Sequence, residues 1–76
     1  MPHQSITLPI YGLTHAGGGK LLLEQTLMRV PGVVHAYVNA DTEMAYVKYD
    51  SDCSSPAQII KVIKLAGFEA GKFNLH

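Results

Sequence analysis

The residues with the greatest capacity for chemistry lie between positions 12 and 20, where His15 stands among four glycines. An imidazole suits borderline ions such as zinc, nickel, cobalt or copper(II), whereas copper(I) prefers thiolate sulfur. One ligand does not complete a site, and Asn39, Asp41 and Thr42 are expected to approach from the same end of the fold. The sequence therefore predicts His15 as a metal ligand, and a solvated loop histidine without metal is the alternative.

The same segment allows a weaker interpretation as an anion site, because Gly17, Gly18, Gly19 and Lys20 lie between a predicted strand and a predicted helix. Glycine-flanked amides at a helix N-terminus attract anions, and a lysine would add to that attraction. A Walker A loop needs glycine at the first position of its pattern, where this chain has Thr14. Nucleotide binding of that kind is therefore excluded.

Cys53 is the single cysteine, so no intrachain disulfide can form. It follows the third predicted strand, and at about 3.3 Å of rise per residue it is expected roughly 20 Å or more from His15. His3 and His76 lie at the two ends of the sequence, on neighbouring predicted strands that could bring them together, but frayed ends are the expectation. No nucleophile beside a base and no carboxylate pair can be assembled, so the chain is predicted not to be an enzyme.

Length and charge narrow the classes of partner. The chain has 76 residues with a net charge of +0, and 47% of its residues are hydrophobic. This composition predicts one folded soluble domain over residues 1–76, with neither nucleic acid nor a membrane as its partner. No apolar run approaches the roughly 20 residues that a membrane span needs. With no leader pattern and a single thiol, a reducing cytoplasm is expected.

Alternating and helical patterns place these residues on elements. Alternation predicts strands over residues 5–11, 34–38 and 44–49, with a turn at 39–42, and a short strand over 68–74. Apolar residues at helical spacing predict a helix over 20–30. Ser55, Pro56 and Gln58 form a capping-box pattern that opens a second helix, and Gly67 follows its end. Pro9 cannot donate to a ladder and by itself favours an edge strand.

The resulting order, βαββαβ, predicts an α+β ferredoxin-like sandwich, a four-stranded antiparallel sheet of order 4-1-3-2 with two helices on one face. The loop after strand one, the turn near Asp41 and the junction of Gly67 and Phe68 then share one end, and Cys53 and His35 lie toward the other. The predicted core packs the helix residues against the strands: Leu23, Leu27, Ile59 and Ile63 against Ile6, Leu8, Ala36, Val38, Ala45 and Val47.

Two predicted surfaces carry more apolar side chains than a solvated face needs. The outward sheet face would hold Tyr11, His35, Tyr37, Met44 and Tyr46, and helix one would expose Leu21 and Met28 one heptad apart. These surfaces favour contact with a partner protein or a homodimer. Isolated exposed apolar residues without a partner are the alternative.

The chain resembles the heavy-metal-associated domains of copper chaperones and of the amino-terminal regions of metal-pumping P-type ATPases. The resemblance covers nearly the whole chain. It rests on Leu8-Pro9-Ile10, Gly12-Leu13-Thr14, Leu23-Glu24, Leu27, Val30-Pro31-Gly32-Val33, Ala36, Val38-Asn39, Thr42-Glu43, Ala45, Val47, Tyr49-Asp50, Ser55-Pro56, Ile63 and Ala66-Gly67-Phe68-Glu69-Ala70. It also accounts for Pro9 in a central strand, since a Leu-Pro step is common there in this family.

The resemblance implies a metal-binding or metal-trafficking function, with a metal ion or a metal-transport protein as partner. The family binds its metal through Gly-Met-Thr-Cys-x-x-Cys, and this chain lacks both cysteines. His15 stands at the first, and the second falls at Gly18 or Gly19 because the loop is one residue longer. The sequence thus predicts a heavy-metal domain with a His-containing or degenerate loop holding a divalent ion or none. The alternative is a metal-free interaction module on the same fold.

Overall fold

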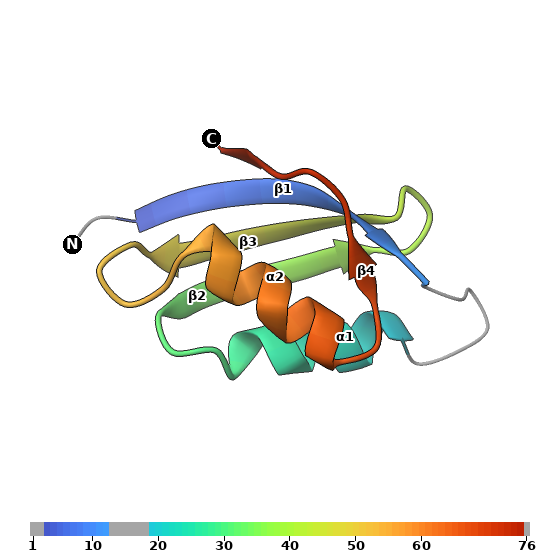
Figure 1. Ribbon diagram of the computed structural model, residues 1–76, viewed down its shortest axis with the longest axis horizontal. Helices are drawn as coiled ribbons and strands as arrows, with labels where there is room; N and C mark the ends of the chain where they lie inside the picture. The colour runs from blue at the N-terminus through green and yellow to red at the C-terminus, as the bar shows by residue number, and fades with distance from the viewer. Residues whose placement is uncertain (1–2, 13–18, 76) are drawn as a thin grey trace.

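The computed structural model describes residues 3–12 and 19–75, and their elements follow the predicted order (Figure 1). Both helices cover the same face of an antiparallel sheet. The strands are ordered β2-β3-β1-β4, and β5 also pairs with β1. This arrangement confirms the ferredoxin-like sandwich. The elements are β1 (His3–Tyr11), α1 (Gly19–Met28), β2 (Val33–Asn39), β3 (Met44–Asp50), α2 (Pro56–Leu65), β4 (Glu69–Ala70) and β5 (Asn74–Leu75).

The core lies between the helices and the sheet, and it contains every residue predicted for it. Leu23 and Leu27 of α1 and Ile59 and Ile63 of α2 are each 0% exposed, so the helix phases are confirmed. Val30, just beyond α1, is also buried. The buried cluster consists of Ile6, Leu8, Ile10, Leu23, Leu27, Ala36, Val38, Ala45, Val47, Tyr49, Ile59 and Ile63.

Helix α2 begins where the capping pattern places it. The Ser55 side chain accepts a hydrogen bond from the Gln58 amide at 3.2 Å, and Pro56 occupies the first helical turn. The cap satisfies one of the amide groups that a helix start leaves without a partner. Beyond the helix, Gly67 has a φ of +97°, a left-handed conformation that glycine adopts without strain.

The predicted alternation in the second strand is wrong at Val34. The pairing of β2 with β3 shifts register between Val33 and His35, so this stretch holds one residue more than its partner strand opposes. Val34 is consequently 47% exposed, and Val33 packs against the core instead. A bulge of this kind moves side chains to the other face without changing residue types, so an alternation count misses it.

The predicted last strand is divided into β4 and β5 opposite Pro9. Ile10 pairs with Ala70 and Thr7 with Asn74, so three residues of the last segment face two of β1. Ile10 donates its amide to Glu43 on the β3 side at 2.8 Å, so the Pro9 nitrogen faces β4, where it has no hydrogen to donate. Pro9 therefore lies in a central strand, and the ladder is interrupted where its donor is missing.

Candidate functional site

Three junctions meet at the end of the molecule where β1 leads into α1. Strand β1 ends at Tyr11, beside Glu69 of β4, and the hairpin turn between β2 and β3 joins β1 through the bond from Ile10 to Glu43. A Cβ atom added to Gly12 would lie 3.9 Å from Cδ1 of Phe68, which follows α2. The predicted grouping of these junctions is confirmed. The predicted ligand His15 and the glycines Gly17 and Gly18 lie outside the described residues.

The hairpin turn was expected to contribute further ligands. The Asn39 side-chain oxygen accepts hydrogen bonds from the amides of Asp41 at 2.9 Å and Thr42 at 3.3 Å, which is an Asx turn. This oxygen is therefore already engaged, and the turn over residues 40–43 contains two carboxylates, Asp41 and Glu43. Within residues 3–12 and 19–75, no three His, Cys, Asp or Glu side chains are grouped so that they hold a metal ion.

Lys20 opens α1 after Gly19, and its ammonium group is directed to the edge of the sheet. It lies 3.3 Å from the Glu24 carboxylate and 5.4 Å from the centroid of the Tyr37 ring. The same Glu24 oxygen accepts the Val38 amide of β2 at 2.7 Å. Lys20 thus participates in a contact between α1 and β2, and anion binding by residues 17–20 stays a prediction.

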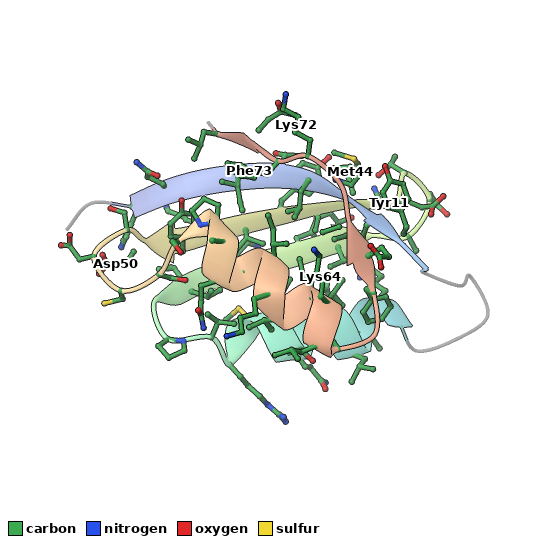
Figure 2. All side chains as sticks on the ribbon, in the orientation of Figure 1. Tyr11, Met44, Asp50, Lys64, Lys72 and Phe73 are labelled. Atoms are coloured by element: carbon green, nitrogen blue, oxygen red, sulfur yellow. The ribbon has the colours of Figure 1, made fainter. Side chains whose placement is uncertain are left out.

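Cys53 lies at the opposite end of the molecule. Its amide donates to the Asp50 carbonyl at 3.0 Å, and its exposed Sγ lies 3.9 Å from an Asp50 carboxylate oxygen. Figure 2 shows Asp50 and Tyr11 at the two ends of the molecule. The only thiol in the sequence is therefore far from the end of β1 and from the loop that contains His15 in the sequence.

Tyr49 is the one group among the described residues whose ionisation clearly shifts. Its side chain is 1% exposed, and its hydroxyl donates to the Gln4 side chain at 3.1 Å. Burial raises the pKa of Tyr49 above the ordinary value of 10.0, because the phenolate would be poorly solvated there. Tyr49 lies on the core face of β3 and is a structural residue.

Most residues of the two surfaces predicted to be apolar are exposed, whereas Met44 is half-buried. Tyr37 and Tyr46 are both 42% exposed and stack with their ring centroids 5.9 Å apart. Tyr11 is exposed at the corner of the sheet, as are Leu21 and Met28 on α1. The exposure of these residues is as predicted, and their role in contact with a partner stays a prediction.

Sequence reasoning missed the outward residues Leu22 and Leu65. Leu65, at the end of α2, is 78% exposed, and Leu22 of α1 is 53% exposed. Both line a hollow between the two helices, together with Thr26, Val62 and Ala66. Their leucine identity was visible in the sequence, but their meeting depends on how the two helices pack side by side.

Comparisons with known proteins complete the description of the site. No family model matches the chain. A stretch of 48 residues is 42% identical to Copper-transporting ATPase 2 of Rattus norvegicus. This stretch covers 63% of this chain and 3% of that protein. A copper binding domain from HMA7, a P-type ATPase, is 32% identical with a TM-score of 0.85, over 90% of both chains. The CopZ metallochaperone is 28% identical with a TM-score of 0.81, over 90% of this chain and 98% of that one.

The similarity to the HMA7 domain shows which family this chain belongs to, because sequence identity and fold agree over nearly the full length of both chains. This chain belongs to the heavy-metal-associated domain family. As a heavy-metal-associated domain it keeps the fold, and its sequence contains a single cysteine, Cys53. Because it spans 3% of Copper-transporting ATPase 2, the activity in that protein's name is not carried over. Neither described helix is long and apolar enough to cross a membrane.

Proposed function

We propose that this domain binds or passes on a heavy-metal ion through His15, in a site that uses nitrogen and oxygen ligands in place of two thiolates. The observation that carries this proposal is the combination of family and sequence. The chain is a heavy-metal-associated domain, its similar structures include a copper binding domain and a metallochaperone, and its loop has His15 at the position of the first cysteine.

The donor set favours a divalent ion. Copper(I) requires soft sulfur ligands, and the only thiol, Cys53, lies beside Asp50 at the other end of the fold. Zinc, nickel, cobalt and copper(II) accept mixed shells of imidazole, carboxylate and water. We propose that the ion completes its shell from carboxylate, backbone or water oxygens near the turn at Asp41, or from the imidazole of a second molecule.

Such a site is a binding module and not a catalytic one, and we propose that it acts in the cytoplasm. The structural relatives are named as a binding domain and a metallochaperone, which supports a role in carrying an ion. The natural partner for such a role is a metal-transport protein. We propose that residues 1–76 belong to a single metal-binding domain.

Isothermal titration with zinc, nickel, cobalt, copper(II) and reduced copper tests the proposal directly. We expect modest affinity for a divalent ion and only weak copper(I) binding in competition with a chelator. Binding should weaken below about pH 6.5, where an ordinary imidazole becomes protonated and no longer donates its lone pair. Tight copper(I) binding by the unmodified chain would refute the proposed change of ligand type.

Two histidine variants provide the matched comparison. His15→Ala should abolish divalent binding, whereas His35→Ala, which removes an exposed imidazole from β2, should leave it unchanged. If His15→Ala binds zinc or nickel as well as the parent does, the ligands lie elsewhere, with His3 and His76 as the next candidates. In the opposite direction, His15→Cys combined with Gly18→Cys or Gly19→Cys should create tight copper(I) binding.

A second candidate function is a metal-free interaction module, and the exposed aromatic face favours it. Tyr11, Tyr37 and Tyr46 are 42–53% exposed on one sheet face, and Leu21 and Met28 are exposed on α1. If no metal ion binds in the titrations, we infer that these surfaces carry the function through a partner protein or a homodimer. Charge-neutral variants such as Tyr46→Ser would then reduce the association.

A further inference from the structure

The helix layer carries an apolar groove on its outer surface, between α1 and α2. One hollow of about 360 Å³ lies between the helices and is lined by Leu22, Thr26, Val62, Leu65 and Ala66. Leu65 is 78% exposed and Leu22 is 53% exposed, although both belong to residue types that folded proteins usually bury. The groove is thus an apolar surface that the domain itself does not cover.

A second hollow adjoins the groove at Leu65 and is lined by residues of α2 alone. It has about 460 Å³ and is lined by Ala57, Ile60, Lys61, Lys64 and Leu65, so Leu65 forms the ridge between the two hollows. Lys61, Lys64 and Leu65 fall on one side of α2, since residues three and four apart are neighbours on a helix. Lys61 and Lys64 are both exposed, and Figure 2 labels Lys64 beside α2. The groove is therefore apolar along its floor and basic along one side.

The charges of this surface are not balanced locally. Helix α2 contains Lys61 and Lys64 and no acidic residue, and within the described part of the chain neither ammonium forms a salt bridge. The acidic residue of α1, Glu24, is already engaged with Val38 and Lys20 at the edge of β2. Because the chain as a whole has a net charge of +0, the compensating carboxylates lie on the strands and loops. The groove side of the domain is positive.

This charge pattern discriminates between occupants. A second copy packed groove to groove about a twofold axis would bring two surfaces of the same positive sign together, without a carboxylate from either α2 between them. An anionic membrane gains only about 1 kcal/mol for each lysine near its surface, which two lysines do not turn into stable binding. A partner with apolar side chains in its centre and carboxylates at its margin satisfies both features.

We propose that the groove between α1 and α2 docks an acidic amphipathic helix of a partner protein, with leucine-like anchors beside Leu22 and Leu65 and carboxylates facing Lys61 and Lys64. A helix is the occupant that fits, because side-chain ridges of a third helix pack into the groove between two others. This docking is independent of the metal ion. It uses residues on the outer side of the helices, and none of them is a proposed ligand.

A designed peptide tests this proposal. The probe is a fluorescent helical peptide of about 20 residues, with leucine at positions i, i+3, i+4 and i+7 and glutamate beside them. Two control peptides carry lysine in place of glutamate, or the same composition in scrambled order. Fluorescence anisotropy should show binding of the acidic peptide alone, weakening as salt rises from about 0.05 to about 0.3 M. NMR shift changes should centre on Leu22, Lys61 and Leu65.

Variants of exposed residues keep the fold intact and assign the binding. Leu65→Ser and the double variant Lys61→Glu with Lys64→Glu should each weaken binding by about tenfold or more. The matched controls are Leu21→Ser, an exposed leucine of α1 outside the groove, and Lys72→Glu, an exposed lysine remote from α2 in Figure 2. Both controls should bind the peptide as the parent does. Thermal unfolding of each variant checks that it folds.

Four outcomes would overturn the proposal. The proposal fails if the lysine peptide binds as well as the acidic one. It also fails if the control variants lose as much affinity as the groove variants. Binding of anionic vesicles that Leu65→Ser abolishes would assign the groove to a membrane surface. Dimerisation of the parent in sedimentation that Leu65→Ser abolishes would assign it to a second copy.

Discussion

Removing the Glu24 carboxylate tests how the open edge of the sheet is protected. Strand β2 is the outermost strand, so its outward amides have no strand partner. The Val38 amide donates instead to the Glu24 carboxylate at 2.7 Å, and the Glu24 side chain is only 18% exposed. A hydrogen bond to a charged group contributes about 1.5–3 kcal/mol, and partial contact with water favours the lower half of that range. We expect Glu24→Ala to lower the free energy of unfolding by about 2 kcal/mol.

Two further variants separate the charge from the rest of the side chain. Glu24→Gln keeps an oxygen acceptor without the charge, so we expect a loss of about 1 kcal/mol. Gln25→Ala changes the neighbouring exposed residue of α1 and should leave stability within about 0.5 kcal/mol. The ion pair with Lys20 is a small part of the effect, because the Lys20 side chain is 38% exposed and such pairs contribute about 0–1 kcal/mol.

Urea denaturation and amide hydrogen exchange provide the measurements. Glu24→Ala should shift the urea midpoint and speed exchange of the Val38 amide, while the slope with denaturant stays constant. The reasoning is refuted if Glu24→Ala and Gln25→Ala have equal stability. It is also refuted if the Val38 amide of Glu24→Ala exchanges at the parent's rate. Confirmation would show that α1 shields the β2 edge, a common place for unwanted strand pairing.

Three other predictions follow from packing and ionisation. Leu27→Ala should cost about 2–5 kcal/mol in denaturation, since Leu27 is 0% exposed, and a loss below about 0.5 kcal/mol would contradict its core role. Gly71→Ala should destabilise by about 1–3 kcal/mol, because its Cβ would lie 2.5 Å from Pro9 Cγ; an unchanged midpoint would show that the segment shifts freely. Burial raises the pKa of Tyr49, so the stability it contributes is full below about pH 10 and is lost as pH rises through the folded pKa. Tyr49→Phe should therefore flatten the stability curve in the alkaline range, and parallel curves would contradict this.

Local patterns predicted most of the fold because each is a property of a few neighbouring residues. Alternation in β1 and β3 and the spacing of Leu23 and Leu27 give the buried faces directly. The cap at Ser55 is equally local, and its bond to Gln58 is present. Val34 was misplaced because a bulge depends on the partner strand, which the residue's own neighbours do not reveal.

Some features of the functional surfaces were likewise predictable from local sequence, and others depend on contacts between distant residues. The alternation of apolar residues was sufficient to predict that Tyr37 and Tyr46 lie together on the outward face. Residues opposite each other on neighbouring strands share a face. The partner of Glu24 was not predictable, since Val38 lies 14 residues away on another element. The role of His15 as a metal ligand is predicted from the sequence and the family, and metal titration is its test.

Amino-acid composition gives the total charge of the domain but not how the charges are distributed over its surface. A net charge of +0 argued against nucleic acid and an anionic lipid surface as partners, and that argument depends on the total charge. A protein partner responds instead to charge within about one Debye length, roughly 8–10 Å. Over that distance α2 presents Lys61 and Lys64 and no carboxylate of its own, beside the exposed Leu65. A neutral domain can therefore select an acidic partner on one face, and the face is defined by helix phase and not by composition.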